Sequence, residues 1–435
     1  MDLLRSAYST NSDEELENPT PTKRFRHQNQ PTSSRPLRPN SHFPNRPNEP
    51  LIPGRYVSKR ERALLLNTSS SSATTSPTPT TTANDLVTPS TATPSVGSVS
   101  SCNLRPDISS SLKVGAKGAA RGQIPEKLSI VLNGHTKAVN AIHWSPTHAH
   151  LLASAGMDHS VYVWNVWSRE DQKKARIFNF HNTAIKDVRW SPQGLFLLSC
   201  GYDCTSRLID VEKGTQTQFF KEDQTVDVVK FHPDNSNLFL SGGSNGLIRL
   251  WDIRAGRVAL EYKRGGLGPI LDVEFSLDGK QFISSADITN GFASENSIIV
   301  WDVSRQIPLS NQVYVEAYTC PCIRYHPFDA LFVAQSNGNY IAIFSSAPPF
   351  RLDKYKRYEK HAVSGFPIKC NFNLDGQILV SGSSDGCIYF YSSKTSELLR
   401  KIKAYERACV DVIFHPRLPN VIASCSWNGD VSVCE

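Results

Sequence analysis

The residues best suited to chemistry in this 435-residue chain are His135, Ser154 and Asp158, which are followed by Trp164. Serine, histidine and aspartate are the residue types of a nucleophile, its general base and the group that orients the base. In hydrolases with a nucleophile elbow, the serine stands on a sharp turn between a strand and a helix. Ser154 instead lies within the apolar run 151–155, where a strand is expected. The pattern therefore favours a structural role over a catalytic one.

These residues lie among short apolar runs that are separated by turn signals. One alternating run ends at Trp144, where Ser145-Pro146 interrupts it, because proline cannot donate a hydrogen bond within a sheet. The second run, 151–155, is followed after a glycine-containing turn by a third that ends at Trp164. Alternation with a period of two between tight turns predicts three antiparallel strands. One such unit cannot bury its apolar faces alone, so we expect it to recur.

The unit occurs seven times, at spacings of 46, 41, 44, 50, 47 and 42 residues. The first strands end at Trp144, Trp190, Phe231, Phe275, Tyr325, Phe372 and Phe414. The third strands end at Trp164, Ile209, Trp251, Trp301, Ile343 or Phe344, Tyr391 and Cys434. This pattern resembles the WD-repeat family, which implies an all-β fold, a seven-bladed β-propeller.

The resemblance implies a structural hydrogen-bond tetrad in the first unit, formed by His135, Ser154, Asp158 and Trp164. In the family, the indole donates to the serine, the serine to the histidine and the histidine to the aspartate. Two further units have partial tetrads: His181, Ser199 and Asp203 in the second, and His361, Ser381 and Asp385 in the sixth. The other units lack the histidine, so we expect their blades to depend more on apolar packing.

The resemblance also implies how the ring closes. In WD-repeat proteins the outer strand of one blade precedes the repeat that supplies the next blade. Leu128–Leu132 would therefore be the outer strand of the seventh blade, whose third strand ends at Cys434. Leu128, Ile130 and Leu132 should face one side of the sheet, and Ser129 and Val131 the other. Strand exchange of this kind would remove an open sheet edge.

Charge divides the chain into two expected domains, a tail at 1–125 and the propeller at 126–435. The tail contains 15 Lys or Arg and 9 Asp or Glu, against 32 and 31 in the propeller. The propeller as a whole is therefore nearly neutral, which gives no long-range attraction to nucleic acid. The cysteines lack the partners and spacing of a zinc site, and the beginning of the chain lacks the features of a signal peptide. No membrane-spanning run, metal site or cofactor motif is expected.

The tail is expected to be disordered and to pack against no part of the propeller, because its Ser/Thr/Pro-rich residues 67–101 cannot bury a core. Its cluster Lys23-Arg24-Phe25-Arg26 predicts nuclear import, the alternative being a solvated basic arm. Any direct contact with RNA is expected through this basic tail.

Two features of the propeller are candidate partner sites. The turn between the second and third strands of the fourth unit is about six residues longer than its counterpart in the second, and it contains Asp287, Phe292 and Glu295. An unconstrained difference in loop length, without a function, explains this longer turn equally well. In the third unit, Trp251-Asp252-Ile253-Arg254 matches a short signature of cullin-type ubiquitin ligase receptors, with Arg254 as the contact.

A narrower resemblance covers the propeller and rests on segments between the shared strands, above all residues 350–361 (FRLDKYKRYEKH). These segments resemble second-step splicing factors of the pre-mRNA-processing-factor-seventeen type and, more closely, their paralogue WD repeat-containing protein twenty-five. The resemblance implies a non-enzymatic nuclear scaffold that binds proteins of an RNA-processing complex, without a membrane or a small-molecule substrate. A ubiquitin ligase receptor is the alternative. An enzyme is disfavoured, because no activated nucleophile, acid and base pair or metal-ligand set is present.

Overall fold

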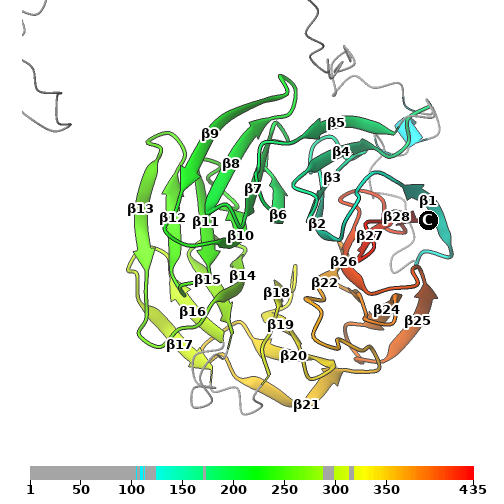
Figure 1. Cartoon of the computed structure of the whole chain (residues 1–435). Helices are drawn as coiled ribbons and strands as arrows, with labels where there is room; N and C mark the ends of the chain where they lie inside the picture. Colours follow the sequence, from blue (N-terminus) through cyan, green and yellow to red (C-terminus); the bar gives the residue numbers. More distant parts are fainter. Residues whose placement is uncertain are drawn as a thin grey trace, which may run out of the picture. The chain divides into compact units, whose positions relative to one another are not determined.

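The computed structural model describes residues 104, 108–110, 112, 124–169, 173–287, 298–312 and 318–435. Within these ranges, 28 strands form seven four-stranded antiparallel sheets, which are arranged as blades around a central axis (Figure 1). The described residues belong to one compact unit, Thr91–Glu435, and the other unit, Met1–Ser90, lies outside the description. The predicted seven-bladed all-β propeller is confirmed.

Each of the first three blades is built from four consecutive strands, from the axis outward. Blade 1 consists of β2 (Val139–Trp144), β3 (Leu151–Gly156), β4 (Val161–Asn165) and β5 (Lys174–Phe178). Blade 2 consists of β6 (Ile185–Trp190), β7 (Phe196–Gly201), β8 (Thr205–Asp210) and β9 (Thr215–Lys221). Blade 3 consists of β10 (Val226–Phe231), β11 (Leu238–Gly243), β12 (Ile248–Asp252) and β13 (Arg257–Tyr262).

The next three blades follow the same order. Blade 4 consists of β14 (Ile270–Phe275), β15 (Gln281–Ala286), β16 (Ile298–Asp302) and β17 (Pro308–Gln312). Blade 5 consists of β18 (Cys322–Tyr325), β19 (Leu331–Ser336), β20 (Tyr340–Ser345) and β21 (Leu352–Tyr358). Blade 6 consists of β22 (Cys370–Phe372), β23 (Ile378–Ser381), β24 (Cys387–Ser392) and β25 (Leu398–Lys403). Phe344, and not Ile343, is the residue of β20 that corresponds to Trp164, because it pairs with Phe332 as Trp164 pairs with Leu152.

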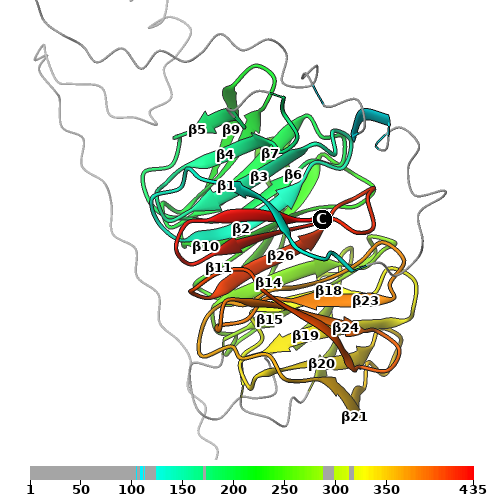
Figure 2. The ribbon, with the colours of Figure 1, turned by 90° about the vertical axis from the view of Figure 1, so that its right-hand side faces the viewer.

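Blade 7 joins the two ends of the propeller. It consists of β26 (Cys409–Phe414), β27 (Ile422–Ser426), β28 (Val431–Cys434) and, as its outer strand, β1 (Leu128–Leu132). In the antiparallel register Leu132 pairs with Val431, and Figure 2 shows β1 crossing beside the red C-terminal strands. The predicted strand exchange is therefore confirmed. The predicted alternation is confirmed too, since Leu132 is buried and Val131 is 48% exposed.

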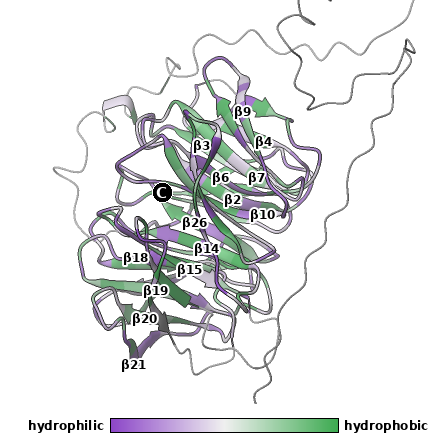
Figure 3. Cartoon of the chain, turned by 90° about the vertical axis from the view of Figure 1, so that its left-hand side faces the viewer, coloured by the Kyte–Doolittle hydropathy of each residue, from purple (hydrophilic) through white to green (hydrophobic). Residues whose placement is uncertain are grey.

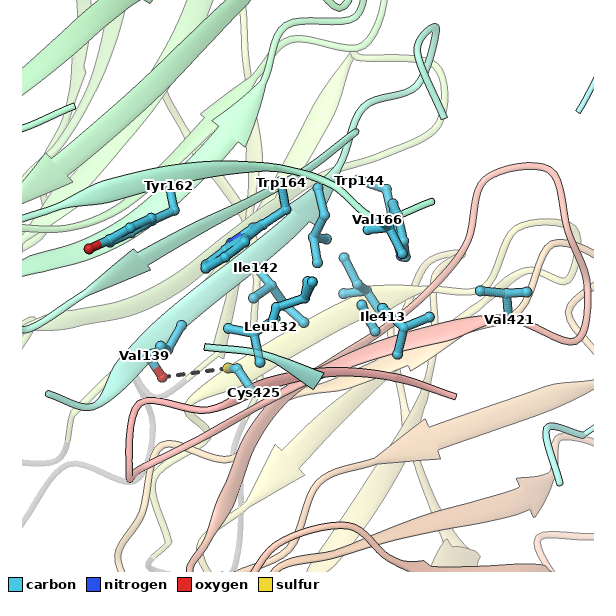
Figure 4. Packing of buried hydrophobic residues seen from close by; sticks show 14 of the residues in the cluster. Leu132, Val139, Ile142, Trp144, Tyr162, Trp164, Val166, Ile413, Val421 and Cys425 are labelled. Carbon is cyan, nitrogen blue, oxygen red and sulfur yellow. Dashed lines mark hydrogen bonds between the residues drawn. The ribbon is translucent and has the colours of Figure 1, made fainter. Parts of the chain in front are cut away.

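The junction of blades 7 and 1 is packed with apolar side chains from both ends of the propeller. Leu132 lies in one cluster with Val139, Ile142 and Trp164 of blade 1 and with residues of β26 to β28 (Figure 4). The Cys425 thiol donates a hydrogen bond to the Val139 carbonyl oxygen at 3.5 Å. Burial of this cluster requires β1 to be in place, so the strand is part of the core.

Residues of the expected tail also pack against this junction, which corrects the prediction from sequence. Leu112 is 8% exposed, and Leu104 and Ile108 are partly buried against the same cluster. The Arg417 guanidinium donates to the Leu112 carbonyl oxygen at 3.2 Å. Ile108 and Leu112 are helical, whereas Leu104 forms an isolated antiparallel bridge with Ser168.

The burial pattern of each strand depends on its position within the blade. Inner strands are covered by neighbouring blades on both sides, so β3 and β4 are buried along their whole length, whereas outer strand β9 alternates between exposed and covered residues. In Figure 3, hydrophobic colour accordingly gathers on the strands and hydrophilic colour on the connecting loops. The core of the propeller therefore lies between the blades.

The first strands of all blades run in the same direction along the axis. In blades 1 and 2, for example, Asn140 bonds to Ile185, His143 to Trp190, and Thr147 to Gln193, in the same order along both chains. Consequently the turns that join first to second strands, and third to fourth strands, lie at one end of the propeller. We call this end the a–b face. The opposite end, formed by the turns between second and third strands and by the links between blades, is the b–c face.

Candidate functional site

The tetrad of blade 1 forms a continuous chain of hydrogen bonds near the b–c face. The Trp164 indole N–H donates to the Ser154 hydroxyl at 2.8 Å, and Ser154 lies 2.8 Å from His135 Nε2. Because the indole can only donate, the serine proton points to Nε2, and His135 Nδ1–H donates to Asp158 at 3.0 Å. Burial opposes ionisation of Asp158, but the hydrogen bond from His135 and the backbone N–H groups of Thr136 and Ser160 together outweigh it and hold the pKa of this carboxyl below its usual value.

This geometry leaves Ser154 without access to a substrate. The serine is fully buried in the middle of β3, and its oxygen already binds the indole and the imidazole. A buried donor that loses its partner costs about 1–3 kcal/mol. The tetrad thus gives hydrogen-bond partners to a buried indole, a buried hydroxyl and a buried imidazole, which is a structural role.

Blade 2 contains the same arrangement without the indole. His181 lies 2.8 Å from the Ser199 hydroxyl and 2.9 Å from Asp203, and the buried Ile209 occupies the tryptophan position. Arg207 also reaches Asp203 at 3.2 Å. Burial again opposes ionisation of Asp203, but the hydrogen bonds from His181 and Thr205 and the Arg207 cation together outweigh it and hold the pKa of this carboxyl below its usual value.

Blade 6 departs from the expected partial tetrad. His361 contacts neither Ser381 nor Asp385 by a hydrogen bond; its Nε2 instead lies 2.6 Å from the amide nitrogen of Gln335, on β19 of the preceding blade. Ser381 donates to the same amide's oxygen at 3.1 Å, and the Tyr391 hydroxyl lies 3.0 Å from His361 Nδ1. The expectation was wrong here, because a glutamine from a neighbouring blade fills the space between histidine and serine. Burial lowers the pKa of His361 to about 4.

Asp385 has other partners near the rim of the propeller. Its carboxylate accepts from the Tyr389 hydroxyl and from the Lys401 ammonium, both at 2.8 Å. Burial opposes ionisation, but these partners keep the pKa of Asp385 below its usual value. Asp385 therefore ties β24 to β25 and does not orient His361.

Two blades without a histidine have polar substitutes, which the sequence analysis missed. In blade 3, the Trp251 indole donates to Ser241 at 2.9 Å, and Ser241 donates to the buried Glu222 at 2.5 Å. Arg249 neutralises Glu222 at 2.9 Å. In blade 7, the Tyr405 hydroxyl takes the place of the imidazole, 2.9 Å from Ser424. These blades therefore do not depend on apolar packing alone.

The central axis is lined by buried charges of both signs. Asp187, Asp272 and Asp411 project from the first strands at β-bulges, which turn a side chain out of the regular alternation. Each carboxylate accepts a backbone N–H from the next blade, of Val229, Ile323 and Ile142 respectively, at 3.4, 2.8 and 3.2 Å. Neighbouring blades are thus joined through aspartate side chains.

Cations complete this ring of charges. Arg189 contacts Asp187 at 3.1 Å and Arg324 contacts Asp272 at 2.6 Å. Lys369 lies 3.4 Å from Asp411. The cavity that remains has a volume of about 80 Å³, whereas pockets for small ligands usually measure about 300–1,000 Å³. The charged groups of the axis therefore pair with one another.

Comparison with known proteins matches the geometry of the blades. A model of the WD domain, G-beta repeat, matches residues 126–165, 172–210, 214–252 and 354–392. Each match begins at the outer strand of one blade and ends at the third strand of the next blade. Blade 7 follows the same rule, because its outer strand β1 precedes blade 1 in the sequence and its third strand is β28. This chain belongs to the WD-repeat family.

Two groups of WD-repeat proteins are similar over the propeller. WD repeat-containing protein 25 of Mus musculus is 36% identical over 312 residues, which are 71% of this chain and 58% of that protein. Pre-mRNA-processing factor 17 of Homo sapiens is 30% identical over 308 residues, 70% of this chain and 52% of that protein. The factor of the same name from Saccharomyces cerevisiae is 26% identical, over 72% of this chain and 68% of that protein. The chain thus spans little more than half of the first two relatives.

The a–b face of this WD-repeat propeller exposes large apolar side chains beside the opening of the axis. They stand on the turns after the first strands of blades 2, 4, 5 and 6: Leu195, Leu277, Phe328 and Leu374, exposed by 52, 63, 72 and 42%. Leu195 also borders a cleft of about 430 Å³ between blades 1 and 2, which Trp190 and Phe196 line. We call these four residues the apolar arc.

Two buried histidines, His326 and His415, and the partly buried His232 hold the turns of the a–b face in position. His232, His326 and His415 each contact, through Nε2, a carbonyl oxygen of the next blade, of Gly279, Gly376 and Ala149. Their Nδ1 atoms accept backbone N–H groups of their own turns, so Nε2 carries the proton. Burial lowers the pKa of His415 to about 3.

The predicted partner sites of the WD repeats lie on different faces. Trp251 is buried on β12, Asp252 is partly buried, and Arg254 follows on the a–b face with its side chain 70% exposed. Arg254 Nε lies 3.6 Å from Asp252. Asp287 begins the long turn on the b–c face, where its N–H donates to the Pro269 carbonyl at 2.8 Å.

Several predicted residues lie outside the described part of the chain. They are Phe292 and Glu295 of the long turn and the basic residues Lys23, Arg24 and Arg26 of the tail. Within the described ranges, no group of three or more His, Cys, Asp or Glu residues is arranged to hold a metal ion. No helix in those ranges is long and apolar enough to cross a membrane.

Proposed function

We propose that this chain is a non-enzymatic scaffold of a nuclear RNA-processing complex related to pre-mRNA splicing, and that it binds a protein partner through its a–b face. The apolar arc carries the proposal. Large apolar side chains on rigid turns provide binding energy at little entropic cost, about 25 cal/mol for each Å² removed from water. The cleft beside Leu195 could receive a side chain of the partner.

The link to RNA processing rests on the relatives. Pre-mRNA-processing factor 17 is named for that process, and its similarity covers the propeller that would bind the partner. Pre-mRNA is processed in the nucleus, which agrees with the import signal expected at Lys23, Arg24 and Arg26. The absence of catalysis is supported by the buried Ser154 and by the mutual pairing of the charges at the axis.

Affinity purification of the tagged full chain from nuclear extract tests the proposal. We expect RNA-processing proteins to be recovered, and expect a Leu277→Glu/Phe328→Glu chain to lose them, because two charges would have to be desolvated in the contact. Phe219→Glu is the matched control: this phenylalanine is 60% exposed on β9, away from the a–b face. Both variants should melt like the wild type.

Two results would contradict the proposal in different ways. Recovery of no RNA-processing protein by the wild-type chain would refute the role in RNA processing. Recovery by all three chains alike would show that the partner binds elsewhere than on the apolar arc.

A ubiquitin ligase receptor is the second candidate, because Arg254 is exposed on the same face in the expected signature. The role requires that a cullin-type ligase adaptor is recovered with the chain and is lost on Arg254→Ala. Arg305→Ala is the control, since Arg305 follows β16 at a similar place in blade 4 and is 73% exposed. Recovery of the adaptor by the Arg254→Ala chain would exclude the signature as the contact.

A further inference from the structure

The outer strand of blade 5 contains a bulge that none of the predicted sites uses. On β20 and β21, Ala342 pairs with Arg357 and Phe344 pairs with Leu352, so the single residue Ile343 lies opposite four residues, 353–356. The Asp353 carboxylate accepts the backbone N–H groups of Tyr355 at 2.9 Å and Lys356 at 3.1 Å. The extra residues are therefore pushed out of the sheet and held in a defined turn.

Tyr355 stands at the tip of this bulge with its side chain in solvent. It is 97% exposed, more than any other large hydrophobic residue in the described part of the chain. Tyrosine normally covers much of its ring against the protein. Both ring faces of Tyr355 are thus open, on a backbone that Asp353 keeps in place.

The surroundings of Tyr355 are strongly basic, in a propeller that is nearly neutral as a whole. Five of the ten residues 351–360 are Lys or Arg, and two are acidic. Glu359 pairs with Arg357, and Asp353 is engaged by the turn. Four exposed cations remain, and none forms an ion pair with another described residue: Arg351, Lys354, Lys356 and Lys360.

We propose that this bulge binds a single-stranded polynucleotide, with one base stacked on the Tyr355 ring and the phosphates held by the surrounding cations. An exposed aromatic ring between cations is the arrangement by which proteins bind single strands without reading their sequence. A duplex would leave the ring unused, because its bases are already stacked. An acidic protein segment would use the lysines but would not need the ring. This contact does not depend on the protein-binding role of the a–b face.

The direct test measures binding of the purified full chain to a fluorescein-labelled oligouridylate of 12 nucleotides by fluorescence anisotropy. Stacking of one base on an aromatic ring is worth about 1–3 kcal/mol, so Tyr355→Ala should weaken binding about 5- to 150-fold. This substitution changes no charge, and Tyr355→Phe, which keeps the ring, should bind like the wild type. Phe219→Ala, on the outer strand of blade 2, is the control for an exposed ring elsewhere. Equal affinity of the Tyr355→Ala and wild-type chains would overturn the proposal.

The salt dependence tests the cations separately. Each phosphate contact with a single strand contributes about 0.7 to the slope of log K against log salt concentration, so Lys354→Ala/Lys356→Ala should reduce the slope by about 1.4. Ultraviolet crosslinking of the wild-type complex should place the oligonucleotide on a peptide that contains Tyr355. Crosslinks found only in other peptides would count against the site.

Competitors distinguish the kinds of ligand. If oligothymidylate displaces the probe as efficiently as unlabelled oligouridylate does, the site binds single strands of DNA and RNA alike. If oligothymidylate displaces the probe less efficiently, the site prefers RNA. Both results support the proposal. Displacement by a duplex or by polyglutamate as efficient as by oligouridylate would overturn it, in favour of an unspecific or a protein ligand.

Discussion

The closure of the propeller by β1 can be tested with two substitutions on adjacent residues of one strand. Leu132 is 1% exposed within the cluster that joins blades 7 and 1, whereas Val131 is 48% exposed on the opposite side of the same strand. Truncation of a buried leucine to alanine costs about 2–5 kcal/mol, because both the transfer energy and a cavity contribute. Truncation of a surface residue usually changes stability by less than about 0.5 kcal/mol.

These free energies convert to a measurable difference in melting temperature. Unfolding entropy near 60 °C is about 2.1 cal/mol/K per residue, so a propeller of about 310 residues has about 0.65 kcal/mol/K. Leu132→Ala should therefore lower Tm by about 3–8 °C, and Val131→Ala by less than about 1 °C. Differential scanning calorimetry of the two variants and the wild type measures both values. Melting temperatures within 1 °C of each other for the two variants would refute the argument that β1 is part of the core.

The structure leads to two further predictions, and the sequence of the tail leads to a third. Removal of residues 1–123 should lower Tm by about 5–9 °C relative to removal of 1–103, because burial of an apolar side chain is worth about 1.5–3 kcal/mol, and the buried Leu112 with the partly buried Leu104 and Ile108, counted as half each, contributes about 3–6 kcal/mol; equal melting temperatures would show that their packing adds no stability. Burial holds the pKa of His415 at about 3 and that of His361 at about 4, below the unfolded value of about 6.5, so the unfolded state binds protons first as the pH falls. Stability should thus be constant above about pH 6.5 and lower at pH 5 by about 2 kcal/mol for each histidine, as measured by urea unfolding; identical free energies of unfolding at pH 7.5 and 5 would disprove it. Replacement of Lys23, Arg24 and Arg26 by alanine should shift a fluorescent fusion from the nucleus to the cytoplasm, while Arg35→Ala/Arg38→Ala serves as a control of similar charge; an unchanged nuclear signal would exclude this cluster as the import signal.

The sequence alone determined the number of blades, the positions of their strands and the closure of the ring. Strands are specified by local signals, namely alternation with a period of two and turn residues at fixed places, and these signals recur seven times. Leu128–Leu132 could be assigned to blade 7 because the resemblance to WD repeats implies that the outer strand of one blade precedes the repeat that supplies the next blade. The tetrad residues of blades 1 and 2 were also found, since histidine, serine and aspartate come from one unit.

Only the tertiary structure decided which polar side chains meet between blades. Gln335 reaches His361 from the preceding blade, so this contact is not recognisable by spacing within one unit. The same holds for Asp187 and its counterparts at the axis, whose partners lie in the next blade. Glu222, by contrast, stands 19 residues before Ser241, as His135 stands 19 residues before Ser154, and only the residue type departs from the pattern. The exposure of Tyr355 depends on a bulge that an alternating strand pattern does not predict. Pairing across such distances depends on how closely packed blades bring side chains together, and periodicity along the chain contains no information about that.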